Sequence, residues 1–150
     1  MKILFTKSGF EKIIKDKEDL VKQRPLAVLD LKKAREMGDL SENGYYKAAR
    51  AKLNEIDRNI RQLSYLFKFS VIAHDPRKGI ISIGSKVNLK ISGKDKEYVI
   101  VGEHEANPSE GKVSFLSPIG KDLLEKKIGD NISVNSPSGI MNVEIIKIIP

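Results

Sequence analysis

Two carboxylates three positions apart, Asp39 and Glu42, are the side chains of this sequence best suited to chemistry. They belong to the run Gly38-Asp39-Leu40-Ser41-Glu42-Asn43, which lies between two segments with helical patterns. Carboxylate oxygens are the ligands that a hard cation such as Mg²⁺ prefers, and Mg²⁺ often takes only one or two of them from a protein. Two carboxylates alone cannot hold the ion firmly. The pattern is therefore compatible with a cation site that a partner molecule completes.

Turn chemistry gives a second interpretation of the same run. Gly38 suits the end of one helix, Asp39 suits the N-cap of the next, and Glu42 would complete an Asp-x-x-Glu capping box. The two interpretations are compatible, because a helix N-terminus stabilises ionised carboxylates by about 0.3–1 kcal/mol each. Spacing alone leaves both open.

Basic side chains flank the acidic run. Arg35 precedes it and Arg50 follows it, with Lys32, Lys33 and Lys47 nearby. In a hairpin folded about the acidic run, Arg35 and Arg50 would lie nearly opposite each other. They form either an ordinary solvated helix face or a phosphate-binding patch. In the second case, a phosphodiester could meet a metal at the tip while its neighbouring phosphates meet arginine.

Two helical segments must position these residues. In the second segment the apolar positions alternate by three and four residues, at Tyr46, Ala49, Leu53, Ile56, Ile60, Leu63 and Phe67. This is a heptad seam. The first segment fits an antiparallel register in which Leu31 faces Leu53, Val28 faces Ile56 and Val21 faces Leu63. Residues 1–75 are therefore predicted to form an antiparallel coiled-coil hairpin with the acidic run at its tip.

The second half, residues 76–150, changes to short β-rich runs. They are Val71–Ala73 at its border, then 87–91, 98–101, 112–115, 132–134 and 143–146, with Gly, Asn, Ser and Asp between them. Ser117 followed by Pro118 is typical of a helix start, and Leu123-Leu124 follow. We expect a compact sheet domain with one short helix, and an α+β fold for the chain.

Composition restricts the class of protein. The chain has 150 residues, with 27 Lys and Arg against 20 Asp and Glu, for a net charge of +7, and it has no cysteine. Disulfides and Cys-ligated zinc are thus excluded, and the two histidines, His74 and His104, lack zinc-site spacing. No apolar run approaches the ~20 residues that span a bilayer. With no secretion signal apparent, we expect a cytoplasmic protein without a membrane partner.

Residues 35–50, Arg-Glu-Met-Gly-Asp-Leu-Ser-Glu-Asn-Gly-Tyr-Tyr-Lys-Ala-Ala-Arg, closely resemble the tip signature of the Gre family of bacterial transcript cleavage factors. Other parts of the chain continue the resemblance: Arg24-Pro25, Ile83–Val87, Tyr98–Gly102 and Ser117–Lys121. The resemblance covers nearly the whole chain.

That resemblance implies an N-terminal antiparallel coiled coil and a C-terminal FKBP-like β domain with one short helix. It implies docking at the rim of the secondary channel of bacterial RNA polymerase, through the region of Ser117, Pro118 and Gly120. The coiled coil would then reach toward the active centre of a backtracked complex. The factor would rescue arrested complexes as a monomer, without hydrolase activity of its own.

The same resemblance assigns roles at the tip. Asp39 is the principal and Glu42 the assisting residue for a Mg²⁺ ion held jointly with the polymerase and not bound tightly by the factor alone. Arg35, Arg50 and Lys47 fall near the nascent RNA, whose 3′ end is cleaved. In two-metal cleavage the ions sit ~3.5–4 Å apart, one activating water and the other stabilising the leaving oxygen.

Two features depart from the family pattern. The net charge is basic where family members are often acidic, and Gly44-Tyr45 replaces the usual Ala-Glu after Asn43. Gly44 in a first helical turn weakens that turn by up to ~1 kcal/mol relative to alanine.

Two other functions compete with cleavage stimulation. A channel-binding regulator or inhibitor that does not stimulate cleavage is the first, although the retained Asp and Glu at family spacing favour cleavage. A prolyl isomerase is the second. Residues 76–150 contain only two aromatics, Tyr98 and Phe115, which disfavours an aromatic proline pocket.

Overall fold

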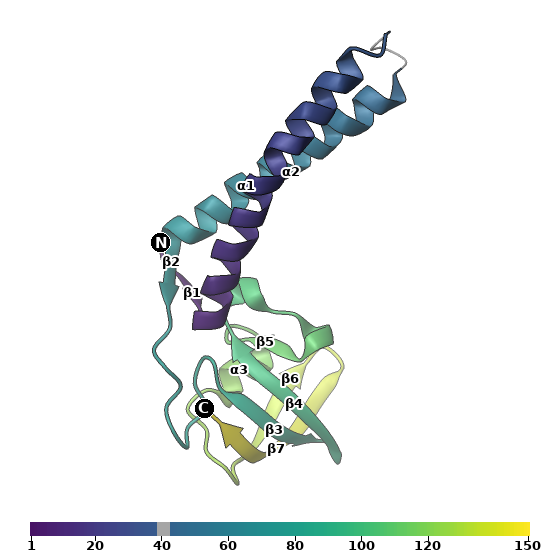
Figure 1. The fold of residues 1–150 in the computed structure, drawn as a ribbon. Coiled ribbons are helices and arrows are strands. Elements are labelled where there is room, and N and C mark those ends of the chain that lie inside the picture. The colour runs from purple at the N-terminus through teal and green to yellow at the C-terminus, as the bar shows by residue number, and fades with distance from the viewer. Residues whose placement is uncertain (39–42) are drawn as a thin grey trace. The chain divides into compact units, whose positions relative to one another are not determined.

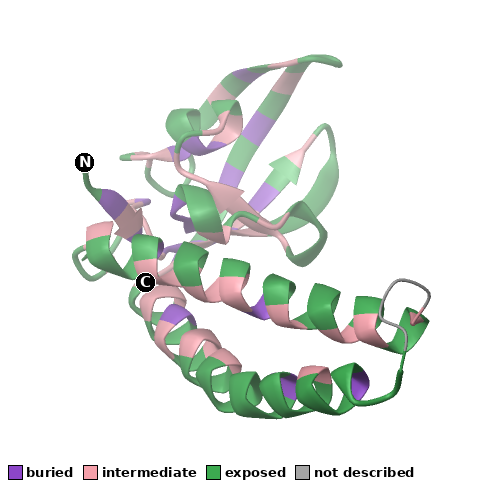
Figure 2. Cartoon of the chain, turned by 90° about the horizontal axis from the view of Figure 1, so that it is seen from above, coloured by how far each residue is buried: buried purple, intermediate pink, exposed green. Residues whose placement is uncertain are grey.

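Two long helices form an antiparallel hairpin in the computed structural model, which describes residues 1–38 and 43–150 (Figure 1). They are α1 (Lys7–Arg35) and α2 (Gly44–Phe69). Exposed residues cover most of both helices, and buried residues are confined to scattered positions along them (Figure 2). The predicted helical hairpin is confirmed.

The seam on α1 differs from the predicted one. Its buried or half-buried positions Ile13, Leu20, Ala27 and Ala34 recur every seven residues. The predicted seam residues Val21 and Val28 are 51% and 41% exposed. Hydrophobicity favoured the two valines, but small alanines let two helices approach closely, and the seam follows the alanines.

The seam on α2 largely matches the prediction. Ile56 is buried, and the other predicted residues from Tyr46 to Leu63 are half-buried. The last predicted residue, Phe67, is 45% exposed, but its ring stacks on that of Phe10 of α1 with centroids 5.6 Å apart. Its neighbour Leu66 is buried.

An ion pair joins α1 to α2. Arg24 donates from Nε to Asp57 Oδ1 at 2.6 Å and from Nη2 to Oδ2 at 3.3 Å. A forked guanidinium–carboxylate contact adds geometric specificity, so this pair fixes the alignment of the two arms. It lies next to Pro25, within a helix that continues through the proline.

This pair makes the hairpin sensitive to acid. The hydrogen bond from Arg24 lowers the pKa of Asp57 below its ordinary value, with the Arg24 and Arg61 charges acting in the same direction and desolvation opposing. Because the folded pKa lies below the unfolded value of about 3.9, the pair stabilises the hairpin above that pH. Its contribution is lost as the pH falls through the folded pKa.

The expected result is a loss of helicity in acid that is smaller in Asp57→Asn than in the original protein, measured by far-ultraviolet circular dichroism against pH. Asp30→Asn, which changes an exposed aspartate of α1, is the control and should lose helicity over the same pH range as the original protein. Equal acid sensitivity in Asp57→Asn and the original protein would contradict the assignment.

The second half forms a curled mixed sheet of five strands in the order β5-β4-β3-β7-β6 (Figure 1). Its strands are β3 (Lys86–Ile91), β4 (Lys94–Val101), β5 (Lys112–Ser114), β6 (Asn131–Ser136) and β7 (Gly139–Ile149). All pairings are antiparallel except that of β4 with β5, which is parallel. Short 3₁₀ turns, Glu103–Glu105 and Pro108–Glu110, connect β4 to β5. The predicted sheet domain is confirmed.

Alternation along the strands builds one core. Val87 and Leu89 of β3 are buried, as are Val143 and Ile145 of β7. The helix α3 (Pro118–Leu123) places Leu123 in the same cluster. The short helix predicted for this half is therefore confirmed, and it packs against the core through Leu123.

A second, two-stranded sheet was not predicted as such. β1 (Ile3–Phe5) pairs in parallel with β2 (Ser70–Ile72), with Ile3 opposite Ser70. Parallel strands need a crossover between them. Here the crossover is the whole helical hairpin, so the residues that precede α1 and those that follow α2 are hydrogen-bonded to each other.

The carboxylate of Glu105 ties this small sheet to the rest of its unit. Its Oε2 accepts hydrogen bonds from the backbone N–H groups of Thr6 at 2.9 Å and Gly102 at 3.0 Å, and Oε1 accepts from the Thr6 hydroxyl. The Thr6 hydroxyl also accepts from Gly9 N at 3.1 Å, which caps the start of α1. A Cβ at Gly9 would lie 1.9 Å from Glu105 Oε1, so glycine is needed for this contact.

Glu105→Ala is expected to destabilise the β1–β2 sheet by about 2–3 kcal/mol, because hydrogen bonds to a charged group contribute about 1.5–3 kcal/mol. Hydrogen exchange of the Ala73 amide, which donates to Phe5 O at 2.8 Å, measures this loss. Glu103→Ala removes an exposed carboxylate from the same turn and is the control. The proposed role of the Glu105 carboxylate is disproved if the Ala73 amide exchanges at the same rate in both variants.

The chain divides into two compact units. One comprises Met1–Gly9 and Ser70–Pro150, and the other comprises Phe10–Phe69. The strands β1 and β2 thus belong with the five-stranded sheet rather than with the hairpin. The boundary expected between residues 75 and 76 stays a prediction. Among the described residues, none of the helices is sufficiently long and apolar to cross a membrane.

Candidate functional site

The far end of α1 finishes in a tight turn. Glu36 N donates to Lys33 O and Met37 N to Ala34 O, both at 3.2 Å. Gly38 follows with φ +110°, a conformation that side chains rarely adopt. Gly38 therefore ends this segment as predicted, by adopting a positive φ. The last residue of α1 itself is Arg35.

Asn43 begins α2. Its Oδ1 accepts a hydrogen bond from Tyr46 N at 3.1 Å, which is N-cap geometry, and its carbonyl accepts from Lys47 N at 3.1 Å. The predicted N-cap of this helix, Asp39, is wrong, because α2 starts at Gly44, directly after Asn43. Asparagine is among the best N-cap residues, and the last such residue before the helix takes the position.

The same Asn43 side chain also reaches α1. Its Nδ2 donates to the carbonyl oxygen of Ala34 at 3.0 Å. Ala34 is fully buried in the hairpin seam. One asparagine therefore links the end of one helix to the start of the other, across the run that carries the two carboxylates.

Basic side chains surround these helix ends. The Arg35 guanidinium lies over the Tyr46 ring, 5.9 Å from its centroid, which joins the last turn of α1 to the first turn of α2. Arg35 thus meets Tyr46, one turn nearer the tip than the predicted partner Arg50. Lys47 and Arg50 are exposed on α2, where phosphates could reach them.

Asp39 and Glu42, the predicted metal and catalytic pair, lie outside the described residues. Within residues 1–38 and 43–150, no group of three or more His, Asp or Glu side chains is placed to hold a metal ion. The chemistry of the donor pair fits Mg²⁺, which binds oxygen and often takes one or two carboxylates while other molecules supply the rest.

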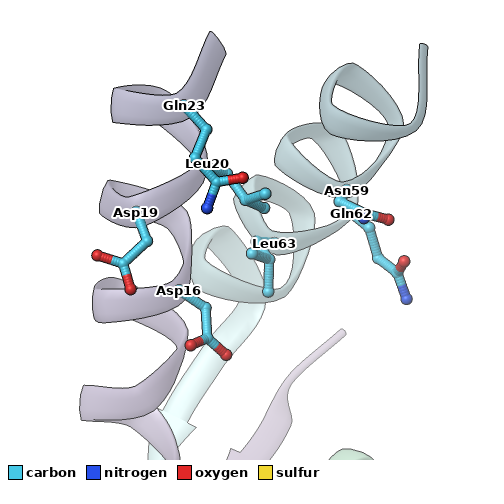
Figure 3. A pocket seen from close by; sticks show the side chains of 7 residues that line it. All are labelled: Asp16, Asp19, Leu20, Gln23, Asn59, Gln62 and Leu63. Carbon is cyan, nitrogen blue, oxygen red and sulfur yellow. The ribbon is translucent and has the colours of Figure 1, made fainter. Parts of the chain in front are cut away.

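A groove between α1 and α2 lies away from the tip (Figure 3). Leu20 and Leu63 line it together with five polar residues: Asp16, Asp19, Gln23, Asn59 and Gln62. Leu20, and not the predicted Val21, shares this groove with Leu63. Asp16 is paired with Lys12 at 2.9 Å, so the groove offers few free charges. We interpret this groove as the solvent-exposed edge of the packing between the two helices.

The predicted docking region surrounds the start of α3. Ser117 Oγ accepts from Gly120 N at 3.0 Å and donates to Ser114 O at 2.7 Å, so Ser117 is the N-cap. Gly120 is buried, and a Cβ there would lie 2.0 Å from Ser114 O. Pro118 and Leu116 are exposed. A partner at this place would touch Pro118 and Leu116, with Ser117 and Gly120 shaping the turn.

Sequence reasoning missed two contacts that join the arms of the hairpin, one made by Asn43 and one by the Arg24–Asp57 pair. Asn43 had a readable signal, because an asparagine directly before a helical pattern is a preferred N-cap. Its bond to Ala34 had none, because the partner is a backbone carbonyl. The Arg24–Asp57 pair connects residues whose distance in the sequence gives no pairing signal.

Comparison with known proteins gives a consistent result. Residues 3–72 match the family model described as "Transcription elongation factor, N-terminal", and residues 76–150 match "Transcription elongation factor, GreA/GreB, C-term". The chain is 41% identical over 149 residues to transcription elongation factor GreA of Nautilia profundicola, covering 95% of this chain and 91% of the relative.

Two further similarities extend along the chain. It is 39% identical over 144 residues to transcription elongation factor GreA of Solidesulfovibrio magneticus, covering 93% and 88% of the two chains. A crystal structure of GreA factor homolog 1 of Thermus thermophilus aligns over 100% of both chains with 27% identity and a TM-score of 0.47.

Proposed function

Because this chain belongs to the GreA/GreB family of transcription elongation factors, we propose that it stimulates cleavage of backtracked nascent RNA by bacterial RNA polymerase. In this proposal the hairpin enters the secondary channel of the polymerase and rescues arrested complexes. The observation that carries it is the placement of Asp39 and Glu42 in the run that joins the far ends of α1 and α2.

The hairpin has the length for this task. The 29 residues of α1 span about 43 Å at ~1.5 Å per residue. The Arg24–Asp57 pair and the alanine seam keep the two arms in one register. Because the arms are fixed in this way, the hairpin is suited to carry the acidic run that joins its two helices.

Asp39 acts as the principal metal-holding residue and Glu42 as the assisting one. Both offer carboxylate oxygens to a Mg²⁺ ion that the polymerase holds jointly, and neither binds it tightly alone. When bound there, the ion supplies Lewis-acid activation of water and stabilisation of charge in phosphodiester hydrolysis. The protein is thus an activator of the polymerase's own reaction and has no hydrolase activity by itself.

Arg35, Lys47 and Arg50 bind phosphates of the RNA near its 3′ end. Lys47 and Arg50 are exposed, and Arg35 is exposed while its guanidinium rests on Tyr46. Arginine suits phosphate recognition because its planar fork donates two parallel hydrogen bonds. These side chains position the transcript and take no part in bond breaking.

The sheet-bearing unit docks on the polymerase through the start of α3. Exposed Pro118 and Leu116 supply the contact, while Ser117 and Gly120 maintain the turn that presents them. The protein works as a monomer in the cytoplasm, where its partner is found.

The test is a stalled elongation complex whose transcript is labelled at the 5′ end. Addition of the protein with Mg²⁺ should shorten the transcript from its 3′ end within minutes, and the shortened RNA should resume elongation when nucleotides are added. Uncut transcript in a complex that binds the protein would indicate a regulator of the channel instead. Cleavage of free RNA by the protein alone would contradict the proposal.

A further inference from the structure

We propose that Asn43 is a positioning residue for the acidic pair: its side-chain amide joins the end of α1 to the start of α2, on either side of the run that carries Asp39 and Glu42. This inference rests on the proposed function of that pair. The geometry that supports it belongs entirely to described residues on either side of the run.

The two functional groups of the amide serve different helices. Nδ2 donates to Ala34 O at 3.0 Å, and Oδ1 accepts from Tyr46 N at 3.1 Å. The first contact occupies a carbonyl at the C-terminal end of α1, and the second satisfies an N–H at the N-terminal end of α2. Both groups lack partners within their own helix. A replacement would have to donate to α1 and accept from α2 at the same time, and it would have to reach both helices.

The anchor on α1 is firm. Ala34 is fully buried, and its carbonyl also accepts from Met37 N at 3.2 Å. The Asn43 contact is itself partly buried. A hydrogen bond to so well-packed a residue transfers the rigidity of the seam to the start of α2.

The glycines on either side of the run contribute no side-chain contact to this end of the hairpin. Gly38 and Gly44 flank the run, and among residues 1–38 and 43–150 a Cβ at either glycine would meet no atom within 4 Å. The Arg35–Tyr46 stacking supports the same end of the hairpin but is a weaker and less directional contact.

Positioning matters here because Mg²⁺ is demanding. It requires near-octahedral geometry with ligands at about 2.0–2.1 Å. A functional constellation must be held within about 0.5 Å of its productive arrangement. Joining the ends of the acidic run before the polymerase is met reduces the ordering that the metal must otherwise impose.

Asn43→Ser separates the link from the cap. Serine remains a good N-cap, but its short hydroxyl cannot also reach Ala34. Gly44→Ala keeps the contact of the Asn43 side chain with Ala34. It strengthens the first turn of α2 by up to ~1 kcal/mol, because alanine favours the helix more than glycine does. The double variant therefore has a well-formed helix start and no link.

The expected result is an increase of about tenfold in the Mg²⁺ concentration that gives half-maximal cleavage by Asn43→Ser, the size typical for lost outer-shell support of a metal ligand. Affinity for the polymerase and helix content should not change. The double variant should remain equally defective, whereas Gly44→Ala alone should cleave like the original protein.

A second measurement does not depend on cleavage. The chain lacks cysteine, so spin labels can be placed at Glu36→Cys and Ala48→Cys, both exposed positions. The distribution of distances between the labels should broaden when Asn43→Ser is added. If the original protein fails to stimulate cleavage, the proposed function is wrong. The distance distribution still tests whether Asn43 holds the ends of the two helices together.

Two results would overturn the inference. The first is an unchanged distance distribution in Asn43→Ser. The second is normal Mg²⁺ dependence of cleavage in that variant, or its full recovery in the double variant, which would reduce Asn43 to an ordinary cap.

Discussion

Asp39→Asn is expected to lower stimulated RNA cleavage by at least about 100-fold, while affinity for the polymerase stays unchanged. Loss of outer-shell support for a metal costs about 10–100-fold, and loss of a direct ligand should cost more. Asparagine keeps the size of the side chain and offers only one neutral oxygen. The measurement is the single-turnover rate of transcript shortening in a stalled complex at limiting Mg²⁺.

The matched control is Glu36→Gln, which removes an exposed carboxylate close to the same run but outside the proposed pair. It should cleave at the original rate. Glu42→Gln should fall between the two, because its role is the assisting one. If Asp39→Asn and Glu36→Gln shorten the transcript at equal rates, Asp39 does not hold the metal.

Leu123→Ala is expected to destabilise the sheet-bearing unit by about 2–5 kcal/mol, the range for removing a fully buried leucine. Leu123 is the contribution of α3 to the core, with no exposed surface, and packs in one cluster with Ile81 and Val134. Because α3 carries the proposed docking turn, polymerase affinity should fall with the loss of stability.

Hydrogen exchange of the β7 amides measures this change, for example at Ile145 N, which donates to Asp130 O at 3.0 Å. Leu116→Ala is the control for stability, because Leu116 is 44% exposed and its truncation opens no cavity. Protection of β7 that is the same in both variants would show that α3 does not complete the core.

Short-range patterns predicted much of this fold. The β-rich runs became β2 to β7, because each alternates or clusters apolar residues between turn residues. The start of α3 was readable from Ser117 and Pro118, since capping is a local interaction. The family was recognisable from residues 35–50, because its signature is one continuous run of sequence.

Features that depend on distant partners were not readable. β1 has three residues, too few for a periodic signal, and its partner β2 follows only after the hairpin. The seam of α1 was misjudged by one residue because hydrophobicity ranked Val28 above Ala27. Helix packing instead selected the small residue, and the Arg24–Asp57 pair fixed the alignment.

The candidate site shows the same division. The acidic residues and their basic neighbours were found by type and spacing alone. The link from Asn43 to Ala34 depends on a backbone carbonyl in another helix, which no sequence pattern marks. The residues proposed for the chemistry were therefore easier to find in the sequence than the residue proposed to position them.

The most direct test asks whether the tip of the hairpin meets the RNA 3′ end inside the polymerase. A photoreactive thiol reagent on Glu36→Cys, in a chain with no other cysteine, is activated in a backtracked complex with labelled RNA. We predict crosslinks to the last nucleotides of the transcript, and none from the same reagent on exposed Ser133→Cys in β6. Absence of crosslinks from position 36 in a complex that retains the protein would contradict the account.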